Sequence, residues 1–214
     1  LYSNDGDGTF SEAVLPSVGT EPFSLAAAWL QYEDGERPDL YIVNDFGGDT
    51  VPNLLYRPED DGFSVAGQES GAAVTMFGMG IAQGDLNDDG YPDLWMSNYL
   101  DPVLLVSMGP RAWYEAAAAS GMGVVRDDQM YGWGTELADF ENDGDLDAWM
   151  GWGPLPGYHI DPDDDAPHQP DSFFLNRNGS FTWMTDSWEL NDDNITRGGI
   201  MTDLDHDGLL DLLR

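Results

Sequence analysis

The chain has 214 residues and a formal net charge of −34, which excludes several classes of partner. So acidic a surface repels nucleic-acid phosphate and anionic lipid, so we expect no nucleic-acid partner and no direct membrane insertion. Cysteine is absent, which excludes a disulfide scaffold, a cysteine nucleophile and thiolate zinc sites. The hydrophobic content of 41% nevertheless predicts a packed core.

Hairpin-like segments recur along the chain, beginning at its first residues. Residues 1–10, 55–63 and 174–181 each read as a strand, a polar turn with glycine, and a second strand entered through an aromatic residue. In the second repeat the corresponding strand at 103–106 is followed by an insertion. The four consecutive alanines of residues 113–119 predict one or two helical turns there.

Between the hairpins, a nine-residue acidic pattern occurs three times, at residues 85–93, 139–147 and 203–211. Oxygen-bearing side chains stand at positions 1, 3, 5 and 9 of each copy, and glycine stands at position 6. This spacing wraps a short loop around one hard cation, and oxygen-only ligands favour Ca²⁺ over Zn²⁺ or Cu²⁺. Mg²⁺ is the weaker competitor because it prefers a stricter octahedron. A fourth, degenerate copy at 31–39 lacks the first Asp and has one extra residue before the last, so we assign no metal site to it and leave open whether it binds metal.

Other acidic loops share the opening of this pattern. EF-hand and dockerin-type loops also require an acid at position 12, where this chain has Met96, Met150 and Arg214. A polar turn that binds no ion is the remaining alternative. Three recurrences in the same register favour cation binding over it.

The acidic loops begin 54 and then 64 residues apart, and each interval holds about four short strands. This is the pattern of a β-propeller blade, so we predict an all-β fold with blades of about four antiparallel strands. A calcium-binding loop is expected between strands 1 and 2 of each blade. The predicted organisation is one propeller segment over 1–214: a hairpin at 1–14, blades at about 24–70, 71–125 and 126–190, and a partial blade at 191–214.

Two arrangements fit this organisation. The chain is a fragment of a longer propeller, which we favour, or residues 1–10 complete the blade of 203–213 and close a ring of four blades.

The loops and their flanks resemble the FG-GAP/VCBS repeat of integrin α-subunit propellers and many bacterial secreted proteins. A glycine precedes each loop by five residues (Gly80, Gly134 and Gly198), and Phe77-Gly78 lies upstream of the first. The residues of the repeat are most similar to those of bacterial relatives of cartilage acidic protein, which often carry an ASPIC/UnbV segment. In such repeats positions 1, 3, 5 and 9 supply side chains to Ca²⁺ and position 7 supplies a backbone carbonyl.

The resemblance implies about three structural Ca²⁺ sites. The implied ligands are Asp85, Asn87, Asp89, Tyr91 and Asp93; Asp139, Glu141, Asp143, Asp145 and Asp147; and Asp203, Asp205, Asp207, Leu209 and Asp211. Glu141 departs from the usual Asp or Asn at position 3, because it is one methylene longer.

The sequence contains no Gly-x-Ser-x-Gly, no His-Glu-x-x-His and no phosphate-binding glycine loop, so we predict no enzymatic activity. The expected role is a calcium-binding module for binding, adhesion or scaffolding of a protein or carbohydrate ligand, alone or as part of a larger complex. Because calcium is plentiful outside the cytoplasm, we expect an extracellular, cell-surface or periplasmic location. The alternatives are part of a secreted carbohydrate-active lyase or hydrolase, and a purely structural subunit of a surface complex.

Two further groups of residues invite functional interpretations. His159 and His168 lie in a Pro- and Asp-rich stretch and are either an extra metal site or part of an acidic surface loop, which we favour. Most tryptophans are expected to pack between strands. Trp133 and Trp152 are the candidates for an exposed carbohydrate platform, because each stands between glycines.

Overall fold

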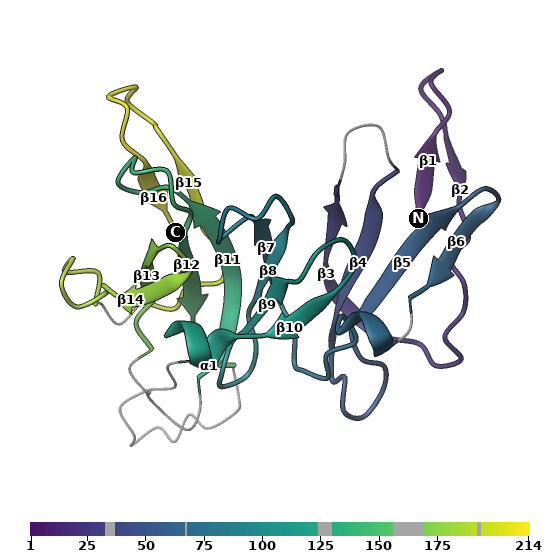
Figure 1. Ribbon diagram of the computed structural model, residues 1–214, viewed down its shortest axis with the longest axis horizontal. Helices are drawn as coiled ribbons and strands as arrows, with labels where there is room; N and C mark the ends of the chain where they lie inside the picture. The colour runs from purple at the N-terminus through teal and green to yellow at the C-terminus, as the bar shows by residue number, and fades with distance from the viewer. Residues whose placement is uncertain (33–36, 67, 124–129, 156–168, 192–193) are drawn as a thin grey trace.

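The computed structural model describes residues 1–32, 37–66, 68–123, 130–155, 169–191 and 194–214. These residues form three four-stranded antiparallel sheets and two two-stranded hairpins, in sequence order along the molecule (Figure 1). Among them, no helix has the length and apolar character needed to cross a membrane. The predicted all-β fold with four-stranded antiparallel sheets is confirmed.

The strands of each sheet follow one another in the chain and pair with their neighbours. The N-terminal hairpin consists of β1 (Tyr2–Asn4) and β2 (Phe10–Glu12). The first sheet consists of β3 (Phe23–Leu30), β4 (Asp39–Asp45), β5 (Leu54–Glu59) and β6 (Gly62–Val65), followed by the 3-10 helix η1 (Gln68–Ser70). The second sheet consists of β7 (Ile81–Gly84), β8 (Asp93–Met96), β9 (Val103–Ser107) and β10 (Trp113–Glu115), followed by α1 (Ala117–Ser120).

The remaining strands complete the pattern. The third sheet consists of β11 (Gly132–Ala138), β12 (Asp147–Trp152), β13 (Ser172–Arg177) and β14 (Ser180–Trp183). The C-terminal hairpin consists of β15 (Ile200–Thr202) and β16 (Asp211–Leu213). Each acidic loop therefore connects the first two strands of its sheet or hairpin, as the repeat predicts.

The helix predicted over residues 113–119 is only partly correct. Trp113–Glu115 form β10 and pair with β9, and the helix is confined to Ala117–Ser120. The Trp113 side chain is buried in the core between the first and second sheets, and this packing outweighs the helix propensity of the following alanines. Gly121, with φ 94°, ends the helix in the left-handed conformation.

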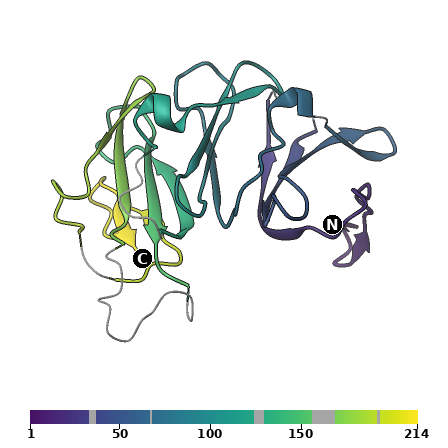
Figure 2. The same ribbon diagram turned by 90° about the horizontal axis from the view of Figure 1, so that it is seen from below.

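The sheets stand in a row, with their first strands adjacent to one another (Figures 1 and 2). Contacts join β3 to β7, β7 to β11, and β11 to β15. The repeated glycines lie at these junctions. A Cβ on Gly80 would be 2.2 Å from the carbonyl oxygen of Trp133, and one on Gly134 would be 2.8 Å from Cα of Gly198. Glycine is therefore required where neighbouring first strands approach.

Two cores fill the spaces between successive sheets. Because side chains alternate along a strand, β8 serves both: Leu94 and Met96 pack toward the first sheet and Trp95 toward the third. The Trp95 indole also donates a hydrogen bond to the backbone oxygen of Trp149, 3.3 Å away. Every residue of β8 is buried, so the middle sheet is covered on both faces.

The ring closure considered from the sequence is not formed among the described residues. The N-terminal and C-terminal hairpins are separate two-stranded sheets at opposite ends of the row (Figure 1). Both expose apolar side chains, including Tyr2 and Phe10 on one and Ile200 and Leu213 on the other.

Candidate metal centres

The three acidic loops have the same backbone conformation. Position 4 is in the left-handed region in each, with φ of 58° at Asp88, 57° at Asn142 and 63° at His206. Asp, Asn and His are the non-glycine residues most often found in this region, which accounts for His206 without a chemical role. The position-6 glycines Gly90, Gly144 and Gly208 also have positive φ, between 86° and 100°.

The carboxylate at position 1 organises the turn of each loop. In the first loop, Asp85 accepts hydrogen bonds from the backbone N–H of Asp89 at 3.0 Å and of Gly90 at 2.7 Å. Equivalent bonds reach Asp139 from positions 5 and 6 of the second loop, at 3.0 and 2.9 Å, and Asp203 from those of the third, at 3.1 and 3.0 Å. Position 1 therefore fixes the middle of the loop.

The carboxylate at position 9 ties the end of each loop to its beginning. It accepts a 2.9 Å hydrogen bond from the N–H of position 2 in all three copies, from Leu86 to Asp93, from Phe140 to Asp147 and from Leu204 to Asp211. The first and last turns of the loop are thereby held together.

Two of these position-9 carboxylates are fully buried. The second oxygen of Asp93 accepts from the N–H of Ser107 on β9, at 2.7 Å, and that of Asp147 from Asn176 on β13, at 2.8 Å. Burial raises the pKa of Asp93 to about 6, and the negative charges of Asp89 and Asp85 add to the rise. Burial raises the pKa of Asp147 as well. A cation in the loop would relieve this accumulation of negative charge.

The third loop has the donor geometry closest to a cation site. Carboxylate oxygens of Asp203, Asp205 and Asp211 lie within 4.8 Å of one another, and no other group of three or more acidic or histidine residues in the described part of the chain does so. The first loop has Asn87 at position 3, whose amide oxygen accepts from the N–H of Asp89 at 3.2 Å. Donors in both loops are oxygen atoms, which suits a hard cation.

In the second loop, a side chain from elsewhere in the protein supplies a positive charge. The Arg177 guanidinium, at the end of β13, pairs with the carboxylates of Glu141 and Asp143, the latter at 3.0 Å. These are positions 3 and 5 of the loop. The position-7 residue of this loop, Asp145, contacts the residue that follows β13: its carboxylate accepts a hydrogen bond from the N–H of Asn178 at 3.0 Å.

At position 7, the structure shows backbone N–H groups bonded within the loop. Those of Tyr91 and Leu209 donate to the position-5 carboxylates of Asp89 and Asp207, each at 2.9 Å. The N–H of Asp145 donates in the same way to Asp143, at 3.1 Å. Coordination by the carbonyls of these residues stays a prediction.

The first sheet compensates its carboxylate differently. Asp39 begins β4 as Asp93 begins β8, and it is fully buried. Arg111, from the turn between β9 and β10, donates from Nε to Oδ2 at 2.9 Å and from Nη2 to Oδ1 at 3.2 Å. The register of β4 and β5 puts Pro58 where Ser107 and Asn176 supply an N–H in the other sheets. Proline has no N–H to donate, so the hydrogen bonds to Asp39 come from Arg111 instead.

The sequence interpretation missed the role of Arg111, although Pro58 was a readable signal for it. It also erred on Trp152, which is 1% exposed and donates its indole N–H to Ser172 Oγ at 2.6 Å. Trp133 is half-buried. His159 and His168 lie outside the described residues.

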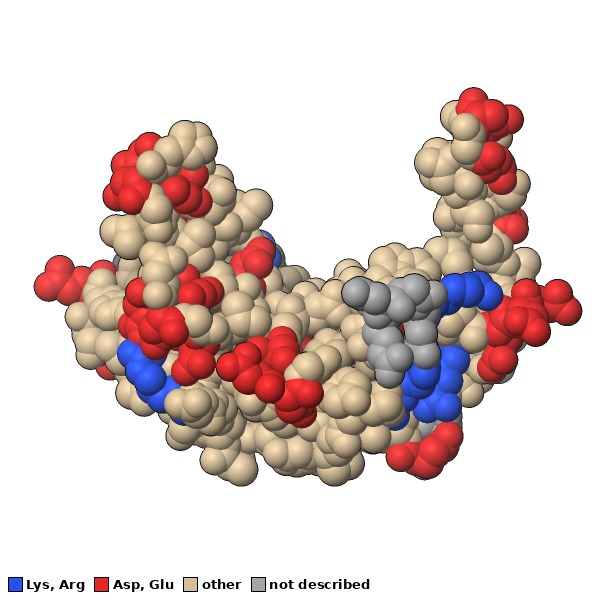
Figure 3. Space-filling view, turned by 45° about the horizontal axis from the view of Figure 1, so that its top comes forward, with Lys and Arg blue, Asp and Glu red and all other residues tan. Residues whose placement is uncertain are grey.

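Acidic side chains gather in separate groups on the face shown in Figure 3, with a few basic residues beside some of them. No protein-family model matches the chain, and no curated protein matches it. The chemistry of the loops therefore has to be argued from their own residues.

Proposed function

We propose that this chain is a calcium-stabilised segment of a β-propeller of the FG-GAP/VCBS type, which serves as a binding, adhesion or scaffolding module. The observation that carries the proposal is the shared frame of the three acidic loops. In each, position 1 holds the turn, position 9 closes the loop, and positions 4 and 6 adopt left-handed φ values. In the third loop, carboxylate oxygens of Asp203, Asp205 and Asp211 lie within 4.8 Å of one another, which supports a cation at the same place in this frame.

Electrostatics supports a structural role for the ion. The chain carries 41 acidic and 7 basic residues, so its compact state suffers strong self-repulsion. Calcium that binds the folded loops, and not the unfolded chain, stabilises the fold by mass action. Burial is the main cause of the raised pKa of Asp93, and the negative charges of Asp89 and Asp85 add to it.

The propeller part of the proposal is supported by the row of sheets with adjacent first strands. Three successive four-stranded sheets meet along β3, β7 and β11, and the C-terminal hairpin contacts the third through β15, which is what neighbouring blades would require. Loops of this class fill with Ca²⁺ where its concentration is millimolar, so we place the protein outside the cytoplasm: extracellular, at the cell surface or periplasmic.

Thermal unfolding in calcium and in excess chelator tests the structural role. At a free Ca²⁺ concentration a hundred times Kd, each site adds about 2.7 kcal/mol. For a domain of this size, each kcal/mol shifts Tm by roughly 2–4 °C. We therefore expect chelation to lower Tm by well over 5 °C, and Mg²⁺ at equal ionic strength to restore little of it. An unchanged Tm would show the proposal to be wrong.

A matched pair of variants assigns the effect to a loop. Asp89→Asn removes the position-5 carboxylate of the first loop, and Asp61→Asn removes an exposed carboxylate from the turn between β5 and β6. The Tm difference between calcium and chelator should shrink by about a third in Asp89→Asn, if the three sites contribute equally. It should stay unchanged in Asp61→Asn.

A further inference from the structure

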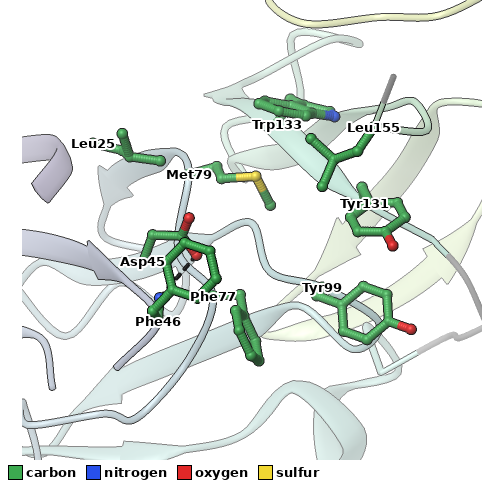
Figure 4. A pocket seen from close by; sticks show the side chains of 9 residues that line it. All are labelled: Leu25, Asp45, Phe46, Phe77, Met79, Tyr99, Tyr131, Trp133 and Leu155. Carbon is green, nitrogen blue, oxygen red and sulfur yellow. Dashed lines mark hydrogen bonds between the residues drawn. The ribbon is translucent and has the colours of Figure 1, made fainter. Parts of the chain in front are cut away.

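A hollow of about 380 Å³ lies at the ends of the strands opposite to the acidic loops. Its walls come from the end of β4, the segment before β7, the segment after β8 and the start of β11. Figure 4 shows Asp45, Phe46 and Phe77 on one side and Tyr131 and Trp133 on the other. All three sheets therefore contribute to one concave surface.

Aromatic rings form a continuous row along this surface. The ring centroids of Phe46 and Phe77 are 5.6 Å apart, those of Phe77 and Tyr99 are 6.1 Å apart, and those of Tyr99 and Tyr131 are 4.8 Å apart. Phe46 is 46% exposed and Phe77 is 40% exposed. Edge-to-face contacts hold Phe46, Phe77 and Tyr99 in position, and the rings of Tyr99 and Tyr131 are tilted by 37° to each other. Such a preformed, partly exposed aromatic wall is suited to an apolar or cationic ligand rather than to water.

One side chain among those that line the hollow is a carboxylate, Asp45. It is half-buried, and its Oδ1 accepts one hydrogen bond, from the N–H of Phe46 at 2.9 Å (Figure 4). It forms no ion pair with the described residues. Burial raises its pKa, as expected for a carboxylate without a cationic partner. The hollow therefore has a site of negative charge that the protein itself leaves uncompensated.

At the end of the hollow near Trp133, the protein itself supplies a positive charge. The Arg197 guanidinium lies 4.2 Å from the centroid of the Trp133 ring, and the Trp133 indole donates to the oxygen of Gly153 at 2.7 Å. A ligand with one positive charge is thus directed toward Asp45 and away from Trp133. Its body would lie along Phe77 and Tyr99.

We propose that this hollow binds a small organic cation, an amine or quaternary ammonium group on an apolar body, with its charge beside Asp45 and the ring of Phe46. Aromatic faces attract such cations, and a nearby carboxylate strengthens the attraction. The net charge of −34 raises the local concentration of any cation. A sugar needs several hydrogen-bonding partners, whereas five of the nine lining side chains have no hydrogen-bonding group: Leu25, Phe46, Phe77, Met79 and Leu155. The inference extends the binding role proposed above and does not depend on the calcium loops.

Calorimetric titration of the whole chain with three probes tests the assignment. The probes are phenethylammonium, its neutral counterpart 2-phenylethanol, and methyl glucoside, all in calcium-containing buffer. We expect the cation to bind about tenfold or more tightly than the alcohol, because only the cation makes a charge-assisted contact with the carboxylate of Asp45. Asp45→Asn, which keeps the Oδ1 acceptor for Phe46, should abolish this preference. Phe77→Ala should weaken both aromatic probes.

Asp49→Asn is the matched control, because Asp49 is an exposed acid four residues away that does not line the hollow. It should keep the preference for the cation. An equal loss in both Asn variants would indicate general attraction by the acidic surface and overturn the proposal. So would equal binding of cation and alcohol, or no binding of the cation, or tighter binding of methyl glucoside. If the chain still melts at a higher temperature in calcium than in chelator, such a failure concerns the hollow alone and leaves the calcium proposal standing.

Discussion

The first sheet differs from the second and third in how it accommodates the same buried carboxylate. Asp39, Asp93 and Asp147 each begin the second strand of a sheet and each is fully buried. Asp93 and Asp147 accept two backbone N–H groups and lie beside further acids. Asp39 instead receives two hydrogen bonds from Arg111. All three sheets share the buried aspartate, and they differ in what compensates its charge: Arg111 for Asp39 and, in our proposal, a bound cation for Asp93 and Asp147.

The two kinds of compensating charge stabilise different parts of the molecule. An ion in an acidic loop would be held by nine consecutive residues, so its effect begins within one sheet. Arg111 belongs to the second sheet and pairs with the first, and its guanidinium also lies 5.0 Å from the centroid of the Tyr32 ring. We infer that calcium stabilises individual sheets, whereas Arg111 fastens two sheets together.

The largest expected effect is a difference in hydrogen exchange after calcium removal. Each vacated site would lower the opening free energy of its sheet by about 2.7 kcal/mol, relative to Ca²⁺ at a hundred times Kd. Amides of β8 and β12 should therefore lose more protection than amides of β4, as measured by exchange mass spectrometry. Equal losses in all three sheets would remove the contrast between them.

Arg111→Met is the next largest. It leaves Asp39 buried without a cation. Breaking a fully buried pair costs about 3–5 kcal/mol, and solvent screening of the partly exposed arginine reduces this to about 2 kcal/mol here. Denaturant unfolding should show the same loss in calcium and in chelator. Arg37→Met, which removes an exposed arginine just before β4 of the first sheet, should cost under about 1 kcal/mol.

The double variant Asp39→Asn with Arg111→Met makes this test specific. Removing the charge of Asp39 should recover part of the stability lost in Arg111→Met, because the two side chains are coupled. If the two single losses simply add, the ion pair is not what stabilises the first sheet.

The smallest effect is expected at Arg177, which pairs with Glu141 and Asp143 in the second loop. Because its guanidinium competes with an incoming ion, Arg177→Gln should raise the Ca²⁺ affinity of this loop roughly two- to fivefold. Calorimetry in an Asp89→Asn, Asp207→Asn background isolates the second loop, and Arg37→Gln serves as the control. A lower affinity would mean that Arg177 positions the ligands rather than competes for them.

Local patterns in the sequence were enough to predict the sheets and the loops between their first two strands. Glycine turns, aromatic strand entries and the acidic spacing are each read within ten residues. The errors lie where distant residues meet. Arg111 and Asp39 are 72 positions apart, and their pairing depends on how two sheets pack. Trp152 stands between glycines, yet β12 is buried at every position.

The same limit applies to the hollow lined by Asp45, because its walls come from three sheets. Neither Asp45 nor Phe46 belongs to a recognisable motif, and the ring contacts from Phe46 to Tyr131 join residues that local patterns do not relate. The bound ion remains a proposal, because it does not follow from the pairing of strands.

The glycines between the first strands carry a consequence for the curvature of the row. Two backbones meet where Gly80 faces Trp133 and where Gly134 faces Gly198, with no room for a methyl group. The spacing of successive sheets at this inner edge is therefore set by main-chain contact, whereas side chains of the two cores, including Trp113 of β10 and Phe181 of β14, fill the space farther out. A single alanine at Gly80 would act as a wedge and open the row at its inner edge.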